Sequence, residues 1–278
     1  MAIKRVLLPF CDGGGGVAPV ADAAFVIGRL FSAQVSGVFA RPLHVTLPIN
    51  DDIATPEIFN RAIENARRER AEKLSQAQQM FEACAGRFPH VDSEFAAAEG
   101  EIGGVVGHAA RLADLSVVGS GSHFAAKGWQ EVRGAALFGS GRPVLLVPPA
   151  GADERSFERV VIAWKESVEA ARAVAAAQPF LRHAKEVYLT AIGENAESTG
   201  SLPEAEQYLQ LHYAEARSEV VPASAKSTGE VLLGKCDALG GALLVMGAYS
   251  HWRWQERVFG GITELVLRAA RTPVLMAH

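Results

Sequence analysis

The feature that most constrains the fold is an internal repeat that relates the two halves of the chain. Three segments of the first half recur in the same order in the second half, and ordered matches of this kind indicate two copies of one structural unit. The matching pairs are residues 4–10 (KRVLLPF) with 158–164 (ERVVIAW), 115–119 (LSVVG) with 243–247 (LLVMG), and 142–147 (RPVLLV) with 272–277 (TPVLMA). The segment 148–153 (PPAGAD) between the copies is rich in residues that interrupt regular structure. We therefore predict one domain at residues 1–148 and another at 155–278.

The pattern inside each copy predicts the fold class. Short, continuous, β-branched apolar runs are typical of strands buried on both faces, and helical patterns lie between them. In the second copy Ser167 is a predicted helix N-cap, and the helix continues to about Leu181. Further strands are expected at 187–191, 218–222, 242–247 and from Val274, and further helices at 203–212, 228–239 and 261–270. This alternation implies right-handed crossovers, so the prediction is α/β, with two tandem doubly wound five-stranded parallel-sheet domains.

The first copy carries an extra segment that reads as one long amphipathic helix. Thr55 is a predicted cap, Pro56 occupies the first helical position, and Glu57 favours the positive end of the helix. Apolar residues then recur near helical spacing at Phe59, Ala62, Ile63, Ala66, Leu74, Phe81 and Cys84. We expect this stripe to pack on the sheet, and the alternative is a face that docks a partner protein.

Composition and charge exclude several classes of protein. The chain has 278 residues and a net charge of -4, with no excess of Lys and Arg to neutralise a polyanion, so nucleic acid is not expected as a partner. Three cysteines without close spacing argue against a disulfide framework and a zinc site, and they fit a reducing compartment. No signal-peptide pattern and no apolar run of membrane-spanning length is present. We expect a cytoplasmic protein without a membrane partner.

A glycine-rich turn follows the fourth predicted strand of the second copy. In a doubly wound sheet, ligands bind beyond the carboxyl ends of the strands. A small residue at Gly247 lets the backbone approach a ligand, and the pair Gly260 and Gly261 opens a helix whose free N–H groups can hold phosphate. The alternative is purely structural, with Gly247 ending a strand and the glycine pair making a turn.

The order of elements, this turn and the closing Pro-Val-Leu strand at 273–275 resemble the universal stress protein family. The resemblance covers essentially the whole chain, once per half, so the chain is similar to a tandem member. It implies the adenine nucleotide alpha hydrolase-like fold and an intrachain pseudo-dimer that pairs through residues 144–147 and 274–277. It also implies a regulatory role in the stress response, with ATP or another adenine nucleotide as the candidate ligand, and a possible homodimer.

The nucleotide-binding members of the family carry Gly, two residues, Gly, nine residues, then Gly followed by Ser or Thr. On that pattern Gly247 and Gly260 match, Ser250 replaces the second glycine, and Gly261 replaces the hydroxyl residue, with Thr263 two positions further on. The candidate ligand-binding residues are therefore Trp164, Lys165, Ala191, Met246, Gly247, Ser250, Gly260, Gly261 and Thr263.

The two copies are not equivalent at the site that the resemblance implies. Family members place an acidic residue after the first strand, but this chain has Cys11 in the first copy and Lys165 in the second, with Asp12 and Glu166 one residue later. The position aligned with Gly260 is Gln130 in the first copy, so the phosphate turn is missing there. We expect a degenerate site in the first domain and a partly retained phosphate turn in the second.

Catalytic constellations are scarce in the sequence. It contains neither His-x-x-x-His nor Cys-x-x-Cys, and no Gly-x-Ser-x-Gly elbow, so no catalytic or metal-binding residue is assigned. Three hypotheses remain: a regulatory sensor of a small ligand, an interaction scaffold that binds unknown protein partners without nucleotide, and a slow nucleotide hydrolase. Because the fold alone cannot separate these classes, the site must decide between them.

Overall fold

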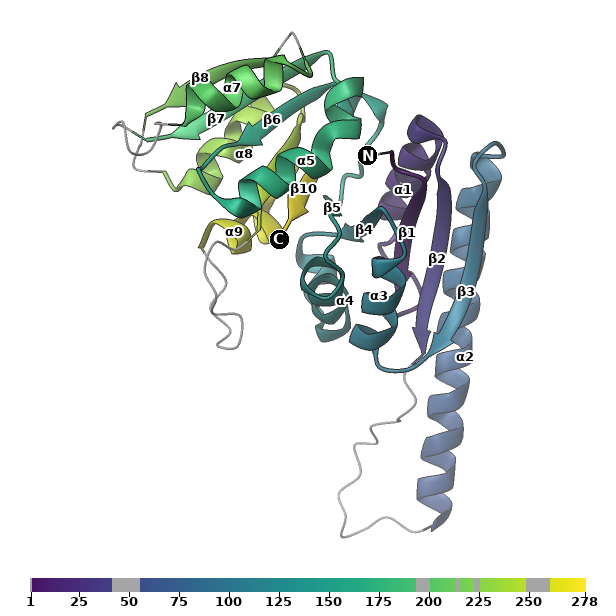
Figure 1. The fold of residues 1–278 in the computed structure, drawn as a ribbon. Coiled ribbons are helices and arrows are strands. Elements are labelled where there is room, and N and C mark those ends of the chain that lie inside the picture. Colours follow the sequence, from purple (N-terminus) through teal and green to yellow (C-terminus); the bar gives the residue numbers. More distant parts are fainter. Residues whose placement is uncertain (1, 42–55, 194–200, 214–215, 223–225, 249–260) are drawn as a thin grey trace.

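The computed structural model describes residues 2–41, 56–193, 201–213, 216–222, 226–248 and 261–278, and these residues form alternating strands and helices (Figure 1). The first half contains β1 (Arg5–Phe10), α1 (Ala18–Phe31), β2 (Gln34–Arg41), α2 (Pro56–Arg87), β3 (Ser93–Glu99), α3 (Ile102–Arg111), β4 (Leu115–Gly119), a 3₁₀ turn (Ser122–Phe124), α4 (Lys127–Phe138) and β5 (Val144–Val147). After a second 3₁₀ turn (Glu154–Phe157), the second half contains β6 (Arg159–Ala163), α5 (Val168–His183), β7 (Glu186–Ile192), α7 (Leu202–Gln210), β8 (Ala216–Val221), α8 (Thr228–Ala238), β9 (Leu243–Gly247), α9 (Gly261–Ala269) and β10 (Val274–Ala277).

All the strands form one sheet in the order β3-β2-β1-β4-β5-β10-β9-β6-β7-β8. The pairs within each half are parallel, as the alternation of strands and helices predicts. The halves join through β5 and β10, which run antiparallel with Leu145 opposite Leu275. This is the pairing of closing strands that the resemblance implies. It removes two sheet edges at once and leaves β3 and β8 as the outer strands.

The predicted elements of the second half occur with ends shifted by no more than a few residues. The N-cap at Ser167 is confirmed, since its side chain accepts a hydrogen bond from the amide of Ala170 at 3.2 Å. Thr55, the predicted cap of the long helix, lies outside the described residues. In the second half, the local sequence pattern therefore decides whether a segment forms a helix or a strand.

The helix α2 is present, but its apolar stripe packs on the sheet only along its C-terminal part. Phe81 and Cys84 are fully buried, and the Phe81 ring contacts those of Phe25 and Phe95. Phe59, by contrast, is 48% exposed, because the first part of the helix extends past the sheet (Figure 1). A helix of 32 residues is about 48 Å long, whereas a strand of seven residues spans about 23 Å. The prediction that the whole stripe packs on the sheet is therefore wrong for its N-terminal part.

The helices cover both faces of each half-sheet. In the first half α1 packs with α2 on one face, and α3 packs with α4 on the other. In the second half α5 covers β9 and β10, α7 lies along β8, and α8 packs against α9. Within the described ranges, no helix is both long and apolar enough to cross a membrane.

Candidate functional site

Several predicted site residues of the second half meet at the carboxyl ends of β6, β7 and β9. Trp164 directly follows β6, and its amide donates to the carbonyl of Thr190 in β7 at 2.8 Å. Ala191 is the next residue of β7 and is fully buried, while Met246 and Gly247 end β9 on the other side of β6. Because β6 lies between β7 and β9, the structure brings these residues together at the carboxyl ends of the strands.

The charged residue of this group is Lys165, which is exposed. No ion pair involves Lys165 among the residues that the structure describes. It precedes α5, where Ser167 caps the first turn. A cation and the positive end of a 16-residue helix therefore lie next to each other at the carboxyl edge of the sheet. The Trp164 indole donates to the Ser201 hydroxyl at 3.1 Å, which fixes its ring toward α7.

Gly247 has a structural reason to be glycine, in addition to any ligand. A Cβ at this position would lie 2.7 Å from the Cβ of Glu169 and 2.8 Å from the amide nitrogen of Ala170, both in the first turn of α5. The absence of a side chain therefore allows α5 to pack closely over the end of β9. The structural alternative for Gly247 is confirmed, and a contact with ligand stays a prediction.

The remaining candidates belong to the glycine-rich turn. Gly261 opens α9 and is exposed, and Thr263 in the first turn of α9 is buried. Ser250 and Gly260 lie outside the described residues. Only the helical side of the predicted phosphate turn can therefore be placed, at the start of α9.

In the first half, aromatic side chains fill the corresponding place. The Phe124 ring lies so close to Gly119, at the end of β4, that a Cβ on the glycine would overlap the ring atoms. Phe124 contacts the indole of Trp129 edge to face, and both residues are almost fully buried. Gln130, which aligns with Gly260, lies in the first turn of α4 and donates to the carbonyl of Ala125. The first half thus has a helix start and two packed rings in this place, whereas residues 249–260 of the second half lie outside the described residues.

The carboxylate that follows β1 is also used internally. Asp12 accepts hydrogen bonds from the Trp129 indole at 2.8 Å and from the Gly14 amide at 3.0 Å. Gly14 has a φ of +79°, which favours glycine at this turn. Asp12 therefore holds the loop after β1 to α4, and both of its oxygens already have a donor.

The chain superposes over nearly its full length on several solved structures. The protein has the fold of the universal stress proteins, repeated in tandem. A universal stress protein from Archaeoglobus fulgidus aligns with 98% of this chain and 97% of its own at a TM-score of 0.68 and 17% identity. A Pseudomonas aeruginosa protein assigned to the universal stress proteins aligns with 99% of this chain and 93% of its own, at a TM-score of 0.58 and 13% identity. A functionally unknown P. aeruginosa protein aligns with 99% of this chain and 92% of its own, at a TM-score of 0.56 and 13% identity. No family model matches the sequence. No curated protein matches it either.

The three cysteines of this chain have raised thiol pKa values, so the thiols stay protonated at neutral pH. Burial raises the pKa of Cys11 to about 12, and the negative charges of Asp12 and Glu131 act in the same direction. Burial likewise raises the pKa of Cys84 and of Cys236 to about 12. Since the thiolate is the reactive form, these raised pKa values lower the reactivity of the three thiols at neutral pH.

A group of metal ligands is not assembled in the part of the chain that the structure describes. Among those residues, no three His, Cys, Asp or Glu side chains come close enough together to hold an ion.

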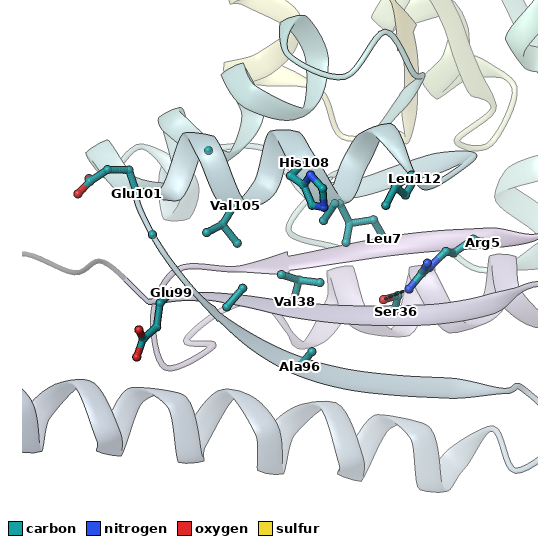
Figure 2. A pocket seen from close by; sticks show the side chains of 14 residues that line it. Arg5, Leu7, Ser36, Val38, Ala96, Glu99, Glu101, Val105, His108 and Leu112 are labelled. Atoms are coloured by element: carbon teal, nitrogen blue, oxygen red, sulfur yellow. Dashed lines mark hydrogen bonds between the residues drawn. The ribbon is translucent and has the colours of Figure 1, made fainter.

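One hollow of the surface was not predicted from the sequence. It lies between α3 and the strands β1, β2 and β3, has a volume of about 470 Å³, and is called the α3 groove below. Figure 2 shows Val105 and His108 of α3 and its C-cap Leu112 on one side, and Val38 and Ala96 of the strands on the other. Small apolar residues in strands look the same in a sequence whether a helix covers them or not, so no signal in the sequence marks this groove.

Proposed function

We propose that this protein is a regulatory binding protein of the universal stress type with one small-ligand site, in its second half. The asymmetry between the halves supports this proposal more than any other observation. The first-half site is filled by Phe124 and Trp129, and Asp12 has its donors inside the protein. At the equivalent edge of the second half, Lys165 is exposed without an ion-pair partner among the described residues.

The chemistry of the second-half edge favours a ligand that carries negative charge. Lys165 supplies a cation, and the starts of α5 and α9 supply backbone N–H groups. An adenine nucleotide such as ATP is the first ligand to test, with the base near Trp164 and Ala191 and the phosphates near Gly247 and the turn to Thr263. This role needs no catalytic residue and no resident metal.

The test begins with protein purified without added nucleotide. The protein is denatured, and the supernatant is separated by ion exchange to detect released nucleotide. Added ATP with magnesium should then raise the melting temperature, because a ligand at 100 times its Kd stabilises the native state by about 2.7 kcal/mol. Lys165→Glu should weaken ATP binding. Lys127→Glu is the matched control, because Lys127 is an exposed lysine beside the filled first-half site.

Two other results would favour the rival hypotheses. If no nucleotide is released and ATP gives no thermal shift, the sensor hypothesis is wrong and an interaction scaffold becomes the better account. If purified protein releases phosphate slowly from ATP with magnesium, and Gly260→Val abolishes the release, the protein is a nucleotide hydrolase. The expected location in the cytoplasm and role in the stress response are part of the same proposal.

A further inference from the structure

The outer edge of the first half-sheet has free backbone groups. The amide of Val35 in β2 donates to the carbonyl of Asp92. The backbone N–H and C=O groups of the even-numbered residues of β3 therefore point toward β2, and those of the odd-numbered residues point away from the sheet. Within the described part of the chain, the outward N–H and C=O groups of Phe95 and Ala97 form no hydrogen bond. Ala96 and Ala97 are exposed. A strand edge of this kind is a template for another strand.

The opposite edge of the sheet, at β8, is covered by side chains of α7. The amide of Ser218 donates to Glu206 at 3.0 Å, and the carbonyl of Ala216 accepts from Gln210 at 3.2 Å. The Ser218 hydroxyl bonds to the same glutamate. These groups of β8 are the outward ones, so the two ends of one sheet differ: β8 is capped and β3 is open.

The α3 groove beside β3 is also specific to the first half. The sheet register aligns Val6, Val35 and Ser93 with Val160, Val187 and Ala216, so Val38 corresponds to Thr190 and Ala96 to Glu219. The C-caps of the two helices, Leu112 and Leu239, align His108 with Lys235 in the same way.

In the second half, long charged side chains occupy two of these positions, as Glu219 and Lys235. Lys235 forms an ion pair with Glu219, and its ammonium lies 4.6 Å from the centre of the Tyr188 ring. The Thr190 hydroxyl donates to Glu219 at 2.8 Å. The first half has Ala96 in place of Glu219 and Ser36 in place of Tyr188, and these smaller side chains leave the groove open.

Two arginines beside the α3 groove are paired with glutamates, and Glu101, just before α3, also lines the groove. Arg5 forms an ion pair with Glu94 at one end, and Arg41 forms one with Glu99 at the other. The floor between them is formed by Leu7, Val38 and the alanines of β3. Because the floor of the groove carries no charge, the side chains of a bound partner that face it should be uncharged and apolar.

We propose that β3 and the α3 groove together bind an extended segment of another protein, which adds a strand to the edge of the sheet. Its backbone would bond to the free groups of Phe95 and Ala97, and alternate side chains of leucine or valine size would enter the groove. The partner is thus a strand-forming peptide with apolar residues at every second position. The proposal concerns the first half alone and does not depend on nucleotide binding.

A second copy of this chain fits the surface less well. If two β3 strands paired, each groove would receive Ala96, Ala98 or Glu94 of the other copy, because only the even-numbered side chains face α3. Alanine side chains are too small to fill about 470 Å³, and a buried glutamate would need a partner that the groove does not offer. A peptide with larger apolar side chains removes both difficulties.

The experiment uses the full chain and a phage-displayed library of nine-residue peptides. Selected peptides are synthesised with fluorescein, and their Kd is measured by fluorescence anisotropy. Ala97→Pro removes an outward N–H without removing a bond to β2, a change that edge strands tolerate. Val220→Pro, at the corresponding outward position of β8, is the matched control. The double variant Ala96→Glu with His108→Lys introduces the ion pair that fills the equivalent groove of the second half.

We expect the selected peptides to alternate apolar and polar residues, and each groove or edge variant to weaken their binding at least tenfold. Val220→Pro should leave Kd within twofold. Circular dichroism and melting curves check folding, and if Ala97→Pro does not fold, the double variant carries the test. The proposal is overturned if the library yields no alternating peptide, or if binding is unchanged in the variants that fold. A concentration-dependent dimer that Ala97→Pro abolishes would identify a second copy as the occupant and would also overturn it.

Discussion

The indole of Trp129 donates a hydrogen bond of 2.8 Å to the carboxylate of Asp12, across 117 positions of the chain. This bond ties the start of α4 to the loop after β1, at the carboxyl end of that strand. A hydrogen bond to a charged group contributes about 1.5–3 kcal/mol, whereas one between neutral groups contributes about 0.5–1.5 kcal/mol. The closed first-half site is therefore part of what stabilises the first half.

The first prediction tests this bond with Trp129→Phe, which keeps an aromatic ring and removes the indole N–H. We expect the free energy of unfolding to fall by about 1.5–3 kcal/mol in urea denaturation. Trp164→Phe is the control, because its indole donates to the neutral hydroxyl of Ser201, and it should cost less. Equal losses in the two variants would show that the charge of Asp12 does not strengthen the bond.

The second prediction concerns the close packing of α5 on Gly247. Gly247→Ala would place a Cβ 2.7 Å from Glu169, so we expect a loss of about 1–3 kcal/mol in thermal or urea denaturation. Gly234 lies inside α8, where an added Cβ would meet no other atom within 4 Å, so Gly234→Ala should stabilise by about 0.4–1 kcal/mol. If Gly247→Ala were neutral, α5 would have to move away from β9 without cost.

The third prediction tests the junction between the halves. Leu275 of β10 is fully buried opposite Leu145 of β5. Leu275→Ala should lower the free energy of unfolding by about 2–5 kcal/mol, because it leaves a cavity in a packed core. Leu211→Ala removes the same atoms from a side chain that is 78% exposed, and it should change stability by no more than about 0.5 kcal/mol. Similar effects of the two variants would contradict the central position of the β5–β10 pair.

The fourth prediction follows from the buried thiol of Cys236, whose pKa burial raises from 9.0 to about 12. Between these two values the unfolded chain loses the thiol proton and the native state keeps it. The native state then binds more protons, so stability is complete below pH 9 and falls as the pH rises toward 12.

The measurement compares wild type with Cys236→Ala by urea denaturation at about pH 8, 9 and 10. The slope for wild type should become steeper above about pH 9 than that of the variant, by up to about 1.4 kcal/mol per pH unit, the contribution of one proton. Parallel curves would mean that this thiol ionises equally in both states. The same protection should keep Cys236 from reacting with alkylating reagents in the native protein.

The sequence predicts most of the fold because the signals for it are local. The apolar runs, the cap at Ser167 and the closing strands depend on residues close together in the chain, and the structure confirms them. The candidate site is predicted only in part. Lys165 and Gly247 lie at the expected edge, but the close contact of Gly247 with α5 depends on a helix that begins about 80 positions earlier in the chain.

By itself, the sequence determined that the chain repeats one α/β unit, where its strands and helices lie, and which strands close each half, since periodicity and capping are properties of neighbouring residues. The sequence also predicted that the first copy has an extra helix and lacks the phosphate turn, but only the tertiary structure decided which contacts distinguish the two copies. Phe124 and Trp129 fill the first-half site, α2 extends past the sheet, and β3 stays open while α7 covers β8. These differences depend on which side chains meet across the fold, and contacts between distant residues leave no periodic pattern in the sequence.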